Sequence, residues 1–344
     1  MRAFRNRRFW IGLVITLVFL ALFLYPLLRT GFADMGRALA EANYLYLIPA
    51  LAVYFVGVFL RSVRWSYLLL PLGRFSPFRL FPLVVIGFMV NNVLPARLGI
   101  VARAIILGER ERMSKMAAGG TMVVEQVFDG VTLLFFIAVV AIFGVSLAGV
   151  LQGTVYVVAG LFILALVLCL ALASSERLAQ WVVSLVVRLL PHRWRERVGL
   201  WLVRLVEGLG IMRSPWRLLV VFLLSNLVWL AEAGTFYFVA LSFDLGQPFY
   251  VLLLATAVAN LAWALLMTQG GLGSFDLAAQ QTLVFFGVGV GLASSYVLVL
   301  HAVLLLPMTA LGFVFLWLEN LSLSRLVSRG EELSAQEDTA EGET

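Results

Sequence analysis

Two broken apolar segments carry residues of types that bind charged ligands. The first break reads NNVLPARLG and places Asn91, Asn92 and Arg97 directly after an apolar run. Pro95 and Gly99 end the helix there, so that backbone N–H groups and a positive charge lie side by side. This combination favours an anion-binding site. The alternative is that Arg97 extends to the membrane surface or pairs with an acid.

The second break reads TQGGLGSFD and lies between two further apolar segments. Gly270, Gly271 and Gly273 permit a tight turn whose backbone amides can face a phosphate or a carboxylate. Ser274 is expected to cap the helix that follows, with Asp276 in its first turn, where the helix dipole favours an acid. Asp276 is therefore either a helix-start acid or a substrate-binding residue.

An acidic pair, Glu125 and Asp129, occurs in the apolar stretch VVEQVFDG. The two side chains are four residues apart and share one helical face. Each charge costs roughly 2.5–3.5 kcal/mol at the centre of a spanning helix, so the pair requires cationic partners or a water-filled cleft. Arg97 is the expected partner and Arg103 is a second candidate. The acids either hold an arginine in place, or titrate and contact a substrate cation. Acid–base catalysis is disfavoured because no nucleophile, metal motif or phosphate-binding motif accompanies them.

Two other polar residues lie within apolar runs and are candidates for a proton or polar pathway. Glu232, together with Asn226, is expected to face the interior of a helix bundle. His301 is either an interior histidine with satisfied hydrogen bonds or a proton switch. The chain has a single cysteine, Cys169, and two histidines far apart, so we expect no disulfide, metal site or cofactor.

The elements that position these residues are membrane helices. Of the 344 residues 62% are hydrophobic and 13% are charged, whereas a soluble domain carries about 25% charged residues. Several apolar runs reach the roughly 20 residues that cross a bilayer. We predict an all-α polytopic membrane protein. The excess of arginine is interpreted as a mark of the cytoplasmic side rather than as a nucleic-acid-binding surface.

Hydropathy and charge together suggest about six full spans and two re-entrant hairpins. The spans are expected at about 9–28, 44–63, 117–144, 152–173, 217–241 and 293–319. The broken segments are interpreted as hairpins at about 80–107 and 249–287. This plan puts both termini and every lysine and arginine except Arg29, Arg37 and Arg97 at the cytoplasmic side. The two hairpins then enter from opposite faces, which is the pattern of an inverted repeat.

This plan divides the chain into two membrane halves, 1–173 and 217–329, with two further segments. Between the halves, residues 174–216 alternate apolar and basic side chains at helical spacing. They are expected to form amphipathic helices on the anionic lipids of the inner leaflet, with a solvated linker as the alternative. Residues 330–344 are acidic and lack large apolar side chains, so they are expected to be disordered.

On three stretches, NNVLPARLGIVARAIIL, VVEQVFDG and GGLGSFDLA, the chain resembles the lysylphosphatidylglycerol synthase/flippase transmembrane-domain family. The resemblance spans nearly the whole chain and implies a lipid-translocating domain with two re-entrant hairpins in a prokaryotic cell membrane. Asn92, Leu94-Pro95, Arg97 and Gly99 match the family's first motif, and Glu125 and Asp129 match the second. The chain departs from the family pattern at four positions, namely Ile100, Gln126, Gln269 and Asp276.

The residues and the resemblance favour a lipid translocase that moves a phospholipid or a lipid-linked head group through a polar cleft between the hairpins. Arg97 and the glycine amides would hold phosphate, and the acids would balance the arginine or hold an amino group. The alternatives are a proton-coupled carrier of a small polar solute and a membrane-embedded lipid-modifying transferase. No catalytic residue and no soluble aminoacyltransferase domain is recognisable. A second copy of the chain is a further candidate partner.

Overall fold

A computed structural model describes residues 7–30, 32–94, 98–142, 214–266, 268–319 and 321, together with isolated positions between 160 and 185. The elements within these ranges are helices, which confirms the all-α prediction. The bounds are α1 Arg7–Thr30, α2 Ala33–Glu41, η2 Tyr44–Tyr46, α3 Leu47–Leu68, α4 Pro77–Val93, α5 Gly99–Arg110, α6 Lys115–Ile142, α10 Pro215–Ser242, α11 Phe249–Leu266, η4 Gln269–Gly271, α12 Ser274–Phe285 and α13 Val290–Leu318.

Five described stretches are long and apolar enough to cross a membrane. They are Tyr44–Leu68, Lys115–Ala141, Trp216–Ser242, Phe249–Leu266 and Val290–Leu318. Four of them coincide with predicted spans, and α1 covers the predicted span 9–28. The expected span 152–173 and amphipathic segment 174–216 fall almost wholly outside the described residues, and the acidic tail 330–344 falls outside them entirely.

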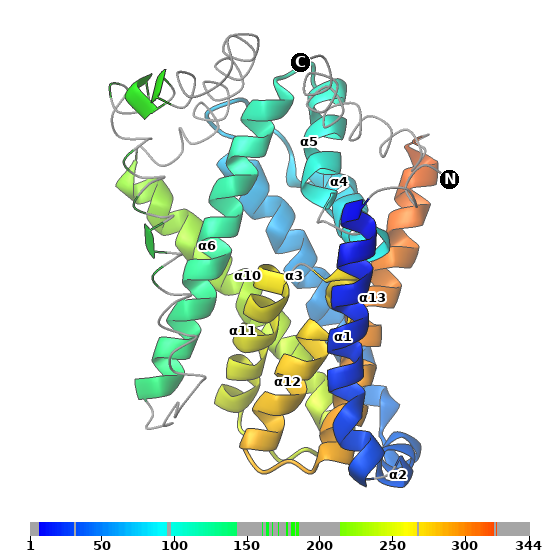
Figure 1. Cartoon of the computed structure of the whole chain (residues 1–344). Coiled ribbons are helices and arrows are strands. Elements are labelled where there is room, and N and C mark those ends of the chain that lie inside the picture. Colours follow the sequence, from blue (N-terminus) through cyan, green and yellow to red (C-terminus); the bar gives the residue numbers. More distant parts are fainter. Residues whose placement is uncertain are drawn as a thin grey trace.

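The two broken segments form helical hairpins at the expected places. α4 and α5 pack against each other, and so do α11 and α12. Figure 1 shows the first hairpin in the upper half of the molecule and the second in the lower half, with their turns toward the middle. The first arm of the second hairpin, α11, has 18 residues and is long enough to cross by length and composition. Re-entry from opposite faces therefore stays a prediction.

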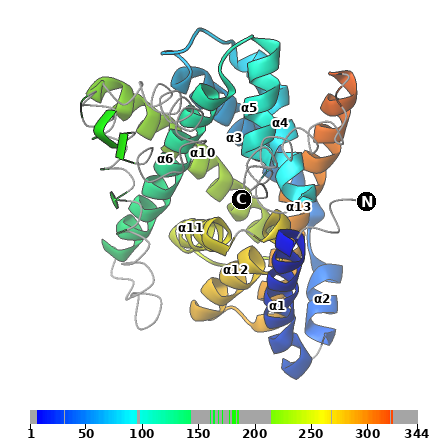
Figure 2. The same cartoon turned by 45° about the horizontal axis from the view of Figure 1, so that its top comes forward.

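The helix contacts follow a pairwise pattern. The order helix, hairpin, helix occurs twice, and the first helices of the two groups, α3 and α10, pack on each other. α4 packs against α13, and α11 packs against α6, so that each hairpin lies on the last helix of the other group. The last helices, α6 and α13, lie on opposite sides of the molecule with the hairpins between them (Figures 1 and 2). Two inverted copies would make this set of contacts.

Small residues allow these helices to approach closely, as is common between membrane helices. A Cβ atom added to Gly57 of α3 would lie 3.2 Å from Ala231 of α10, and one added to Gly234 of α10 would lie 3.1 Å from Val53 of α3. The crossing of α13 and α4 is tighter still, since a Cβ atom added to Gly312 would collide with Met89 Cβ. The helices are therefore closely packed where α3 crosses α10 and where α4 crosses α13.

Candidate functional site

A cavity of about 580 Å³ lies where the two hairpin turns meet. Its walls come from α3, α4, α5, α6, α10, α11, α12 and α13 and from the turn η4. The turns themselves are in contact, since a Cβ atom added to Gly270 would lie 3.4 Å from the carbonyl oxygen of Asn92. The volume falls within the range of roughly 300–1,000 Å³ that is typical of small-molecule sites.

The structure places the sequence-predicted site residues in three groups. Those that line the cavity are Asn91, Asn92, Glu125, Asp129, Glu232, Gly270 and His301. Those that lie behind its wall, in or next to the second turn, are Gly271, Gly273, Ser274 and Asp276. Arg97 lies outside the described residues.

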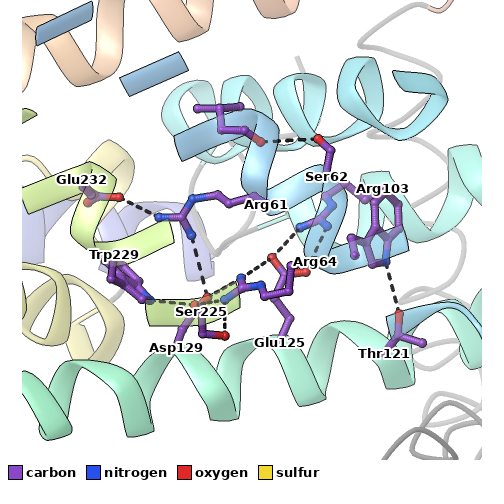
Figure 3. Close-up of polar contacts among 12 residues, drawn as sticks. Arg61, Ser62, Arg64, Arg103, Thr121, Glu125, Asp129, Ser225, Trp229 and Glu232 are labelled. Atoms are coloured by element: carbon purple, nitrogen blue, oxygen red, sulfur yellow. Dashed lines mark hydrogen bonds and ion pairs between the residues drawn. The ribbon is translucent and has the colours of Figure 1, made fainter. Parts of the chain in front are cut away.

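Arg64 of α3 holds the two acids of α6. Its guanidinium lies 2.5 Å from Asp129 Oδ1 and 3.1 Å from Glu125 Oε1, and it also donates to Ser225 Oγ at 2.9 Å. The Arg64 side chain is fully buried and does not line the cavity. Figure 3 shows it between α6 and α10. A buried arginine with several charged contacts serves here as a structural clamp.

Arg103 of α5 makes a second, parallel set of contacts to Glu125. Its two terminal nitrogens lie 3.3 and 3.1 Å from the two carboxylate oxygens, which is the paired geometry that suits a guanidinium. The guanidinium also lies over the ring of Trp65, at 4.2 Å from the centroid. Glu125 is thus held by Arg64 and Arg103, and the first hairpin is tied to α6.

Arg61 of α3 forms a second ion pair that lines the cavity, in addition to that of Arg103 with Glu125. Its guanidinium lies 2.6 Å from Glu232 Oε2 and 3.9 Å from Asp129 Oδ2, and it sits 4.7 Å from the ring centroid of Trp229. Asn260 donates to the other oxygen of Glu232 at 2.9 Å. The side chains of Arg61 and Glu232 are 9% and 12% exposed, so both reach the cavity surface while most of each stays buried.

The described network is electrically balanced. Three arginines, at positions 61, 64 and 103, face three carboxylates, at positions 125, 129 and 232. Balance is expected, because a single unpaired charge in this apolar setting would cost several kcal/mol. A charged ligand that bound one of these groups without compensating charges would break the balance of the described network.

The described partners of the acids agree only in part with the expectation from the sequence. Arg97 was the expected partner and lies outside the described residues, whereas Arg64 binds both Glu125 and Asp129. Arg103, the second candidate, does bind Glu125. The predicted span plan places Arg61, Arg64 and Arg103 at the cytoplasmic side, but all three are buried in the bundle. The sequence did contain a signal for buried arginines, because three carboxylates inside apolar runs require three cations.

The described part of the first turn is held by side-chain amides. Asn91 Oδ1 accepts the backbone N–H of Gly99, the first residue of α5, at 2.8 Å. Asn92 Nδ2 donates to Thr309 Oγ1 of α13 at 3.0 Å. Both asparagines line the cavity, but these side-chain atoms already form hydrogen bonds within the protein. The predicted ligand-binding asparagines therefore also fix the position of the first hairpin.

The second turn differs from the expectation in two respects. Gly273 is the N-cap of α12, rather than Ser274, and its N–H donates to Asp276 Oδ2 at 2.8 Å. Ser274 instead bonds Thr268 through its hydroxyl at 2.6 Å. The amide of Gly271 donates to the Thr268 carbonyl, so the amides of Gly271 and Gly273 are used within the turn. In the structure these two amides bond groups of the protein, and a contact of the glycine amides with a substrate phosphate or carboxylate stays a prediction.

His301 of α13 links the second turn to the cavity wall. Its Nδ1 lies 2.5 Å from Asp276 Oδ1, and its Nε2 lies 3.0 Å from the carbonyl oxygen of Gly270. Asp276 is therefore the helix-start acid and also the partner of His301, whereas its interpretation as a substrate-binding residue stays a prediction. Glu232, the other candidate for a polar pathway, faces the bundle interior as predicted, but Asn226 bonds the backbone of its own helix.

Comparison with known proteins identifies the family. The model of the lysylphosphatidylglycerol synthase transmembrane region matches residues 9–312. The chain belongs to this family. Since the match runs from α1 into α13, both hairpins and the cavity between them are part of the shared region.

Two archaeal relatives cover most of the chain. Both come from Methanothermobacter thermautotrophicus and are described as UPF0104 membrane proteins. One is 27% identical over 331 residues, which covers 90% of this chain and 92% of the relative. The other is 25% identical over 268 residues, covering 73% of this chain and 78% of the relative. No solved structure matches. With the membrane-spanning helices, these likenesses establish a multi-pass membrane protein.

Proposed function

We propose that this protein moves a phospholipid or lipid-linked molecule between the leaflets, with the polar head group passing through the cavity. The observation that carries the proposal is a cavity of about 580 Å³ between two hairpin turns, lined by charged groups of both signs, in a family named for a lipid synthase. The acyl chains would stay in the bilayer while the charged head group is shielded from it.

The Arg61–Glu232 pair is the part of the network best suited to exchange contacts with a head group. Both residues line the cavity, and Arg61 makes its one short ion-pair contact with Glu232. Arg64 and Arg103 are instead bound by two contacts or more to the acids of α6. In this proposal Arg61 binds the phosphate, and Arg97 is kept as a second basic group on the strength of its place in the motif.

Charge balance sharpens the substrate class. A phosphate that binds Arg61 takes the place of Glu232, which would leave a buried carboxylate without a cation. A head group that also carries an ammonium or several hydroxyl donors would restore the lost contacts. The amide of Asn260, which already holds one Glu232 oxygen, keeps the carboxylate in position during this exchange. The proposal therefore favours a head group with both a phosphate and a donor group.

The test is leaflet exchange in liposomes that contain the purified protein. A phospholipid labelled on its acyl chain, with a natural ethanolamine or glycerol head group, is bleached from outside with dithionite. We expect wild-type protein to expose the inner-leaflet label, and Arg61→Gln to slow this at least about tenfold, equivalent to 1.4 kcal/mol. Arg37→Gln is the matched control, because Arg37 pairs with Asp34 at the surface. Wild-type exchange equal to that of protein-free liposomes would overturn the proposal.

A double variant separates lost function from lost folding. Arg61→Gln leaves the Glu232 carboxylate without its short partner, whereas Arg61→Gln with Glu232→Gln removes both charges together. Replacing a buried pair by neutral groups is often close to neutral for stability. The double variant should therefore keep the thermal unfolding temperature of wild type and still exchange lipid slowly. Rapid exchange in that variant would show that this pair does not contact the head group.

A proton-coupled carrier of a small polar solute is the second candidate function. The ionisable pair Asp276 and His301 at the cavity wall favours it. The same liposomes distinguish the two functions, because a carrier would take up solute in response to a pH difference without moving the labelled lipid.

A further inference from the structure

Asp276 and His301 occupy a particular place in the molecule. His301 lines the cavity, whereas Asp276 lies behind it and is 4% exposed. Both oxygens of Asp276 are committed, one to His301 and one to the N–H of Gly273. The ring of Phe275 packs edge-on against the imidazole, with 5.4 Å between centroids, so the pair lies in a mainly apolar environment.

The hydrogen bonds of this pair require one more proton than neutral histidine and an ionised acid provide. The carbonyl oxygen of Gly270 and an ionised carboxylate can only accept, and a neutral imidazole has a single N–H. His301 nevertheless has both ring nitrogens at hydrogen-bonding distance from such oxygens, at 2.5 and 3.0 Å. Both contacts are satisfied if the imidazole is doubly protonated, or if Asp276 carries the proton and donates it to Nδ1.

We propose that Asp276 and His301 form a binding site for one exchangeable proton, and that loss of this proton releases the turn of the second hairpin. With the proton bound, the pair is an imidazolium with a carboxylate or a neutral imidazole with a carboxylic acid, and its net charge is zero. When the proton leaves to cavity water, a neutral imidazole and a carboxylate remain, with a net charge of −1. The remaining N–H stays with the carboxylate, so Nε2 faces the Gly270 oxygen without a hydrogen.

Release of Gly270 would act directly on the meeting point of the two hairpins. Gly270 lies in the turn η4, whose backbone packs against Asn92 of α4. His301 is on α13, the helix on which α4 also packs. Proton loss would thus free one turn at the contact between both hairpins while Asn92 stays bound to Thr309. Loss of the proton from the pair is thereby coupled to the geometry of the cavity.

Other ionisable groups near the pair have partners of their own. From the described residues of the neighbouring helices, α3 presents Arg61 and Tyr54 to the cavity and α10 presents Glu232. Arg61 and Glu232 bind each other, and the Tyr54 hydroxyl donates to the Leu304 carbonyl. The remaining ionisable groups that line the cavity belong to the ion network of α3, α5 and α6, namely Arg103, Glu125 and Asp129. Asp34 and Arg37 of α2 pair with each other at the surface, beside the start of α13.

The proton site can be tested without any transport assay. The chain has two histidines, so ¹⁵N-histidine labelling of a His192→Gln variant reports His301 alone. We expect the ring-nitrogen resonances to shift as one proton leaves between about pH 5 and pH 10. Asp276→Asn should move this transition to lower pH, because the carboxylate that favours the bound proton is gone. No transition in that range, or the same transition in both proteins, would overturn the proposal.

Coupling to transport rests on the proposed lipid translocation and is tested separately. In liposomes with equal pH on both sides, wild-type lipid exchange should change at least about threefold between about pH 5 and pH 9, the range in which histidine pairs titrate. His301→Gln keeps one donor and one acceptor but does not titrate, so its exchange should be independent of pH. An unchanged wild-type profile in His301→Gln would overturn the coupling. Absence of exchange at every pH would instead count against the translocase, while the nitrogen spectra would still decide the proton site.

Discussion

The two hairpins that meet at the cavity close their turns with different chemistry. In the described part of the first turn the contacts are neutral amides, with Asn91 accepting the N–H of Gly99 and Asn92 donating to α13. In the second turn they are an acid and an imidazole, Asp276 and His301. An amide keeps its hydrogen bonds at every pH, whereas an acid–imidazole pair changes with one proton. The first turn is therefore fixed, and the second can respond.

The glycines of the two turns show the same contrast. A Cβ atom added to Gly99 would collide with the carbonyl oxygen of Gly87 and come within 2.6 Å of Asn91 Oδ1. Gly270 has more space, since the nearest atom would be Leu305 Cδ1 at 3.2 Å, but its φ of +58° is one that other residues rarely adopt. The first turn needs glycine at position 99 for close packing, and the second needs it at position 270 for backbone conformation.

The largest effect is expected at the packed turn. Gly99→Ala should destabilise the protein by about 3 kcal/mol, because the added methyl group forces backbone atoms of α4 and α5 apart. The free energy of unfolding can be measured by titration with SDS in mixed micelles. Gly119→Ala in α6 is the matched control, since a Cβ atom there meets nothing within 4 Å. Equal stability of the two variants would contradict the close packing of the first hairpin.

Asp276→Asn should have the second-largest effect and lower the free energy of unfolding by about 2 kcal/mol. The carboxylate uses one oxygen for Gly273 and the other for His301, whereas an amide offers a single oxygen. The amide can keep both contacts only with a neutral imidazole, by accepting from Gly273 and donating to Nδ1, so two charge-assisted hydrogen bonds become weaker neutral ones. The same SDS titration measures the loss, with Asp34→Asn at the surface as its control. A loss below about 0.5 kcal/mol, the range of ordinary surface substitutions, would argue against the double role of Asp276.

The positions of the two hairpins could be predicted from the sequence because their breaks are local. NNVLPARLG and TQGGLGSFD each interrupt an apolar run with residues that end helices, and the described helices stop and restart at these stretches. The acid at the start of α12 was likewise predictable from its place after a glycine run. What failed at this turn was the identity of the cap, because Asp276 reaches back to Gly273 and so replaces the serine hydroxyl.

The ion network could be predicted less completely than the positions of the hairpins. Arg61 and Arg64 stand where the apolar run becomes more polar, so counting charges assigned them to the cytoplasmic side. The helix continues to Leu68, and both arginines turn inward to acids 61 residues or more along the chain. Such pairings depend on how α3 packs against α6 and α10, and hydropathy carries no information about that packing. A charge balance over the apolar runs would have indicated that buried cations were needed, without naming them.

Asn91→Ala should lower the free energy of unfolding by about 1.5 kcal/mol, because the buried N–H of Gly99 loses its acceptor. The loss should be the same at about pH 6 and about pH 9, since an amide does not titrate in this range. Unfolding titrations at both pH values measure it, with Thr309→Val as the control that removes the other neutral hydrogen bond of this hairpin. A loss that varied with pH would remove the distinction between a fixed and a responsive turn.

The smallest effect is expected at Gly270, where two substitutions distinguish the cost of the backbone conformation from the cost of steric crowding. Gly270→Ala should destabilise by about 1 kcal/mol, because alanine resists a positive φ. Gly270→Asn brings a larger side chain but tolerates this conformation better, so it should cost only a few tenths of a kcal/mol. Leu305 can yield, since the contact is with the far end of its side chain. If asparagine proved worse than alanine in the same titration, space and not conformation would select glycine in the second turn, and the two hairpins would be alike in this respect.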